Sequence, residues 1–174
     1  MAAWAGDAEC DRSSLGPVRV EFVKLDNKGR GGCRWDAVRG KRTRVPGTSM
    51  AVGRDIPHDL AQYIIEAAAR YHNGFWDLVA QGATFKSTGR RRTKPGRAVI
   101  AEHREDLAGS ERLAGLHLHL WKGHQAGPVT SALDRAFSQW QVLQTGRRLV
   151  FDWPSAEGRI EPRDAAPVHA ATST

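Results

Sequence analysis

The apolar and aromatic residues of this chain gather into three stretches, and this distribution most limits how the chain can fold. The three stretches are residues 18–38, 56–85 and 98–153. Because a domain folds around a contiguous apolar core, we expect a single folded domain over residues 17–154. The ends of the chain have little apolar surface to bury. Residues 1–16 and 155–174 are therefore expected to form a disordered head and tail.

Apolar and polar side chains alternate in three short segments, as they do in strands with one buried face. The alternation covers residues 18–25, 33–39 and 148–153, and a period of two predicts β-strands. Residues 26–29 are turn formers, so the first two strands should form a hairpin. Each strand is too small to be buried alone. We therefore expect all three in one antiparallel sheet.

Between the strands, apolar residues recur at the three- to four-residue spacing of helices. This spacing predicts about four helices, near residues 57–72, 75–81, 99–121 and 128–145. The third is expected to be weakened at Gly109. Its residues 116–120 alternate leucine and histidine, so they also fit a strand, but the charged residues 102–112 before them favour helix. The predicted fold class is α+β, with a small antiparallel sheet of N-terminal hairpin plus C-terminal strand packed on a layer of about four helices.

The order of short motifs is similar to that of a known group of sequences. Pro57-His58-Asp59-Leu60 is followed by Gly74-Phe75-Trp76 and preceded by the hairpin that carries Arg34-Trp35. In this the chain resembles an uncharacterised family of actinobacterial proteins over about residues 18–153. The resemblance supports one domain over that range, and it implies no activity.

Positive charge is concentrated in two places. The chain has a formal net charge of +7, and residues 18–54 carry ten Lys and Arg against three acids, while residues 86–97 carry six against none. Clustered charge creates a local field that scattered charge does not. Gly and Pro within residues 86–97 predict an exposed, mobile loop whose cations can meet phosphates.

Two functions of different classes fit this charge. The first is a nucleic-acid-associated protein that binds the phosphate backbone with little sequence specificity. The second is a protein-interaction or regulatory module that docks an acidic partner protein. For the first, the candidate nucleic-acid-binding residues are Arg30, Lys41, Arg42, Arg44, Arg90, Arg91, Arg92, Lys94 and Arg97.

Neither catalysis nor metal binding is indicated by a motif. The chain lacks a Gly-x-Ser-x-Gly elbow and a phosphate-loop ending, so we predict no catalytic residue and no cofactor. His117 and His119 could share a metal only if they lay on a strand, and helix is the favoured reading. His58 is expected to bond or pack at a helix start. No apolar run is long enough to span a membrane, and the expected location is the cytoplasm.

Overall fold

The computed structural model describes residues 18–25, 32–40, 43–49, 56–85 and 93–162. The strands are β1 (Val18–Leu25), β2 (Gly32–Arg39), β3 (Thr43–Ser49), β4 (Arg147–Trp153) and β5 (Arg159–Pro162). The helices are α1 (His58–Ala69), α2 (Phe75–Gln81), α3 (Lys94–Glu102), α4 (Arg104–Lys122) and α5 (Pro128–Val142). The predicted α+β class is confirmed.

The five strands form one antiparallel sheet in the order β3-β2-β1-β4-β5. Phe22 on β1 lies opposite Trp35 on β2 and opposite Leu149 on β4. These three side chains are buried on the same face of the sheet, as the period of two requires. The prediction that the N-terminal hairpin and the C-terminal strand share a sheet is confirmed.

Two edge strands were not predicted. β3 contains Pro46 and Gly47, which indicate a turn in a sequence, yet proline is tolerated on an edge strand because it need not donate to a further neighbour. Gly47 lies opposite Trp35, and a β-carbon on it would stand 2.1 Å from the indole ring. β5 lies within the range that we assigned to the disordered tail. It pairs with β4 through four residues, which corrects that boundary.

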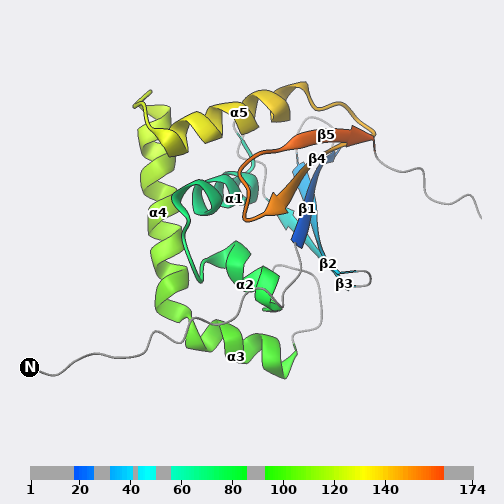
Figure 1. Ribbon diagram of the computed structural model, residues 1–174, viewed down its shortest axis with the longest axis vertical. Coiled ribbons are helices and arrows are strands. Elements are labelled where there is room, and N and C mark those ends of the chain that lie inside the picture. Colours follow the sequence, from blue (N-terminus) through cyan, green and yellow to red (C-terminus); the bar gives the residue numbers. More distant parts are fainter. Residues whose placement is uncertain (1–17, 26–31, 41–42, 50–55, 86–92, 163–174) are drawn as a thin grey trace, which may run out of the picture.

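The helix α1 forms the centre of the molecule. Figure 1 shows it between the sheet on one side and α4 on the other, with α5 along one end. All eight residues from Leu60 to Ala67 are buried, so the helix is enclosed on every side rather than along a single stripe. α5 follows its prediction more closely, because Val129, Leu133 and Trp140 are buried along one face.

The predicted third helix is two helices that meet at His103. The break falls there rather than at Gly109, since His103 leaves the helical region with φ −106° and ψ 30°. Gly109 remains helical, and a β-carbon on it would stand 2.2 Å from the hydroxyl oxygen of Tyr71. Residues 116–120 are helical, as we favoured. Residues 94–97, which we placed in a loop, form the first turn of α3.

A cluster of aromatic rings fills the space between the sheet and α1. Phe22, Tyr63 and Trp76 contact one another edge to face, with centroids 5.2–6.0 Å apart. Trp35 is 1% exposed, whereas Trp153 is only partly buried. Within the described ranges, no helix is both long and apolar enough to cross a membrane.

Candidate functional site

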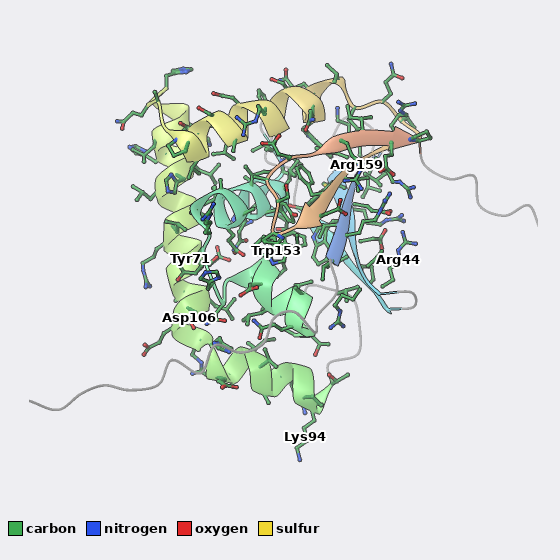
Figure 2. The ribbon with its side chains drawn as sticks, viewed as in Figure 1. Arg44, Tyr71, Lys94, Asp106, Trp153 and Arg159 are labelled. Atoms are coloured by element: carbon green, nitrogen blue, oxygen red, sulfur yellow. The ribbon has the colours of Figure 1, made fainter. Side chains whose placement is uncertain are left out.

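Three of the nine predicted phosphate-binding cations lie in the described part of the chain. They are Arg44 on β3 and Lys94 and Arg97 on α3. The other six lie outside the described residues: Arg30, Lys41, Arg42, Arg90, Arg91 and Arg92. Arg44 is on the outer face of the sheet, whereas Lys94 extends away from the molecule at the N-terminal end of α3 (Figure 2).

The guanidinium of Arg44 is held by carboxylates of the sheet. Its Nε lies 3.2 Å from Asp36 Oδ1, and its Nη2 lies 3.4 Å from Glu21 Oε2. Both acids are buried, at 4% and 6% exposed. Arg44 therefore helps to neutralise two buried charges, and its own charge is largely compensated within the protein.

Those two carboxylates form the centre of an ion-pair network on the outer face of the sheet. Glu21 and Asp36 lie directly opposite each other on β1 and β2, a pairing of like charges that is unfavourable on its own. Arginine nitrogens surround them at 2.9–3.4 Å, from Arg19, Arg34, Arg44 and Arg148. Three of the ten cations of the first basic block, Arg19, Arg34 and Arg44, are thus paired inside the fold.

The cations at the start of α3 are in a different situation. Lys94 and Arg97 are exposed, and within the described ranges neither has a carboxylate within salt-bridge distance. The first turn of α3 contains no acidic residue. Positive charge at a helix N-terminus is electrostatically unfavourable, because the helix dipole is also positive there. An anion bound at this turn would relieve that repulsion.

The backbone amides of this turn are mostly occupied. Thr93 caps the helix, since its hydroxyl oxygen accepts a hydrogen bond of 3.1 Å from the N–H of Gly96. Pro95 has no N–H, and the N–H of Arg97 donates to the carbonyl of Thr93 at 3.1 Å. An anion bound here would therefore contact flexible side chains rather than a rigid set of free backbone N–H groups.

The structure brings the start of α3 to the same corner as the end of β2. The guanidinium of Arg39, the last residue of β2, lies against Gly82 at the end of α2, where a β-carbon would stand 2.7 Å from Nη1. Thr84, two residues further on, accepts a hydrogen bond of 3.1 Å from the N–H of Thr93. Figure 1 shows both ends on the same side of the molecule.

This corner joins two regions that are remote in the sequence. Arg39 and Arg44 flank the turn between β2 and β3, while α3 begins some fifty residues later. Gly82 and Thr84 can be at most about 7 Å apart along the chain. The short segment from Gly82 to Thr84 therefore links the end of β2, which carries Arg39, to the start of α3, which carries Lys94 and Arg97.

The histidines do not form a metal site in the described residues. His117 and His119 both lie on α4 and point to different sides of that helix. The described ranges contain no cluster of three or more His, Cys, Asp or Glu that could hold a metal ion. Cys33 is fully buried, and burial raises the pKa of its thiol, so it is a poor nucleophile.

His58 lies at the start of α1, as expected, between two carboxylates. Its Nδ1 is 3.3 Å from Asp59 Oδ1, and its Nε2 is 3.9 Å from Glu111 Oε2 on α4. The hydrogen bond to Asp59 raises the pKa of His58, with a smaller contribution from the charge of Glu111, against the effect of burial.

Sequence reasoning did not single out Glu66, a buried carboxyl group on α1. It accepts hydrogen bonds from the N–H groups of Phe75 and Trp76, at 3.0 and 2.9 Å, and thereby caps α2. Burial raises the pKa of Glu66 to about 7, although the hydrogen bonds it accepts oppose this effect. An acid within the apolar segment 60–68 was the available signal.

Glu66 requires space that Gly74 provides. A β-carbon on Gly74 would stand 2.6 Å from the carboxyl carbon of Glu66, so the glycine before α2 permits the close approach of the two segments. Glu66 and Gly74 therefore act together to join α1 to the start of α2.

Comparisons with protein-family models, with curated proteins and with solved structures find no match for this chain.

Proposed function

We propose that this protein binds the phosphate backbone of nucleic acid, with low sequence specificity, through the corner where β2 ends and α3 begins. The observation that supports the proposal is that the segment Gly82–Thr84 links Arg39 of the first basic block to the start of α3, which carries two cations of the second. Clustered cations from separate segments form a local positive field that attracts a polyanion.

The charges of Lys94 and Arg97 distinguish the start of α3 from the outer face of the sheet. Arg44 is bound to two carboxylates, whereas Lys94 and Arg97 have no such partner among the described residues. Binding a phosphate through a cation that is already paired would cost its internal ion pair. Lys94 and Arg97 carry no such cost, and they should contribute most of the binding free energy that comes from described residues.

The expected specificity is low because of the kind of contacts available. Lys94 and Arg97 are long exposed side chains at a capped helix start, and contacts of this kind position a protein on phosphates without reading bases. Affinity should therefore depend strongly on salt and weakly on sequence.

The experiment measures binding of a fluorescent duplex and a fluorescent single strand by anisotropy, over a range of salt concentrations. We expect log affinity to fall linearly with log salt, and the double variant Lys94→Ala/Arg97→Ala to bind more weakly. The salt slope of that variant should be smaller by about one per lost phosphate contact. Replacing Arg90, Arg91 and Arg92 by Ala should act in the same direction.

The matched control is Arg112→Ala/Arg135→Ala, which removes the same charge from exposed positions on α4 and α5. It should leave the salt slope unchanged. If the unmodified protein fails to bind DNA or RNA even at low salt, the proposal is wrong. Binding to an acidic polypeptide such as polyglutamate, without binding to nucleic acid, would favour an acidic partner protein instead.

A further inference from the structure

The N-terminal half of α4 is attached to α1 mainly by polar contacts. Only Ser110 and Ala114 are buried among the 19 residues of α4. The later part of the helix packs through apolar side chains, since Leu113, Leu118 and Trp121 lie against the core. Before Leu113, the contacts with α1 and its C-terminal extension include several hydrogen bonds and an ion pair, so the attachment of this half depends on the protonation of polar groups.

Glu66 lies at the centre of these contacts. Its Oε1 accepts a hydrogen bond of 2.5 Å from the hydroxyl of Ser110. The amide of Gln62, one turn earlier on α1, donates to Ser110 Oγ at 3.1 Å and to Glu111 Oε1 at 3.2 Å. Because Ser110 is fully buried, α4 covers Glu66 from water, and lifting α4 would expose the carboxyl group.

We call the hydrogen-bonded group of Gln62, Glu66, Ser110 and Glu111 the polar seam. Two further contacts extend it along both helices. The imidazole of His58 faces Asp59 on its own helix and Glu111 on α4. After the end of α1, the hydroxyl of Tyr71 donates to the carbonyl of Asp106 at 3.0 Å, and Figure 2 shows Tyr71 beside Asp106.

Glu66 changes charge between mildly acidic and neutral pH, because burial raises its pKa to about 7. Glu66 faces Gln62 on α1, two backbone N–H groups of α2 and Ser110 on α4. No cation appears among these neighbours. A negative charge on Glu66 is therefore held without an opposite charge, whereas a positive charge on His58 is attracted by two carboxylates. Raising the pH thus adds an unpaired buried charge at Glu66. The paired charge of His58 is lost only at higher pH than in a free imidazole, because the hydrogen bond to Asp59 raises the pKa of His58.

We propose that this seam is a pH-dependent clasp, which holds the N-terminal half of α4 against α1 at mildly acidic pH and loosens as the pH rises to neutrality. When the N-terminal half of α4 separates from α1, the carboxyl group of Glu66 becomes exposed to water, which favours its ionised form. The open state should therefore gain population with rising pH until Glu66 is ionised in the closed state as well. The inference does not depend on nucleic-acid binding.

The test is amide hydrogen exchange followed by NMR on the unliganded full chain, between pH 5 and 8, with rates corrected for intrinsic pH dependence. Protection of amides 107–111 should fall about tenfold or more between pH 5 and 7, and then level off. Protection of amides in α5 and β1 should change far less. Equal protection of amides 107–111 at all pH values would overturn the proposal.

Variants assign the effect to the seam. Glu66→Gln should remove most of the pH dependence, and Ser110→Ala should lower protection of these amides at every pH. Glu102→Gln, at an exposed carboxyl on α3, is the control and should keep the wild-type pH profile. Should Glu66→Gln fail to fold, the carboxyl carbon of Glu66 can be titrated by NMR in the wild type. A midpoint at the ordinary glutamate value would then overturn the proposal.

Discussion

At the scale of single residues, the core depends on side chains that combine apolar burial with one hydrogen bond. Trp35 packs between the sheet and α2, and its indole N–H donates to Asp59 Oδ2 at 2.7 Å. The N–H of Asp59 in turn donates to Ser49 Oγ at 3.1 Å. Trp35 thus links the hairpin to the start of α1.

Replacing Trp35 by Ala should lower the free energy of unfolding by about 3–5 kcal/mol, because it leaves a large cavity in the core. Trp35→Phe keeps most of the ring but leaves Asp59 without this donor, so its cost should be smaller, roughly 1–3 kcal/mol. Urea denaturation followed by circular dichroism measures both. A cost below about 1 kcal/mol for Trp35→Ala would contradict the burial of this ring.

Glycine positions offer a matched pair of substitutions. Gly74→Ala should destabilise the protein by about 1–3 kcal/mol, since the new methyl group would displace the buried carboxyl of Glu66. Gly115→Ala meets nothing within 4 Å on α4, so it should stabilise the helix by about 0.5–1 kcal/mol. Thermal denaturation of the two variants should therefore shift in opposite directions, and a shared direction would count against this explanation.

At the scale of elements, the sheet has two chemically different faces. One packs on helices, and the other carries the arginines and acids of the ion-pair network. Figure 2 shows Arg44 and Arg159, from opposite edges of the sheet, on the same side. Arg159 Nε lies 2.8 Å from Glu161 Oε1 and its Nη1 lies 2.6 Å from Asp152 Oδ2. Charge compensation thus extends across the strands to β5.

Glu21→Gln should destabilise the sheet by roughly 1–3 kcal/mol, because it removes a buried negative charge shared by several guanidinium groups and replaces one acceptor oxygen with an NH2 donor. Glu157→Gln provides the comparison, since Glu157 pairs with Arg135 at 3.1 Å on the exposed surface and should cost less than about 0.5 kcal/mol. Equal unfolding midpoints of the two variants in urea would show that the network adds little stability.

At the scale of the whole molecule, pH links the helices to overall stability. The folded state raises the pKa of Glu66 to about 7 from 4.5, and it also raises the pKa of His58. A raised pKa means that the folded state binds more protons than the unfolded state between the two values. Stability from both groups is therefore present at lower pH and is lost as pH rises.

We accordingly expect the free energy of unfolding to fall as the pH is raised from about 4.5 to about 7, by roughly 1–3 kcal/mol. Glu66→Gln should flatten this part of the profile. Urea titrations at several pH values measure the slope, and a wild-type stability that rises over this range would contradict the assignment to Glu66. Below this range, protonation of Glu161 lowers the free energy of unfolding as the pH falls. Although burial raises the pKa of Glu161, its hydrogen bonds to Arg19 and Arg159 lower it overall.

The sequence by itself determined the elements whose side-chain period is strong. Alternation over residues 18–25, 33–39 and 148–153 follows from having one buried face, and the stripe of α5 follows from packing along one side. These signals are local. The side-chain period of a strand differs from that of a helix, so a few consecutive residues are enough to tell the two apart. The α+β class and the sheet that joins the two ends of the domain could therefore be predicted.

Only the tertiary structure decided the features that depend on remote partners. In the sequence, Pro46 and Gly47 indicate a turn, but in the fold they lie on an edge strand where Gly47 packs against Trp35. In the sequence, Glu66 resembles an exposed acid of a helix, but in the fold α2 and α4 cover it. Arg44 and Lys94 look alike in the sequence, yet Arg44 is neutralised by two carboxylates, whereas Lys94 has no carboxylate partner among the described residues. Charge and burial are properties of the space around a side chain, and folding creates that space from residues far apart in the chain.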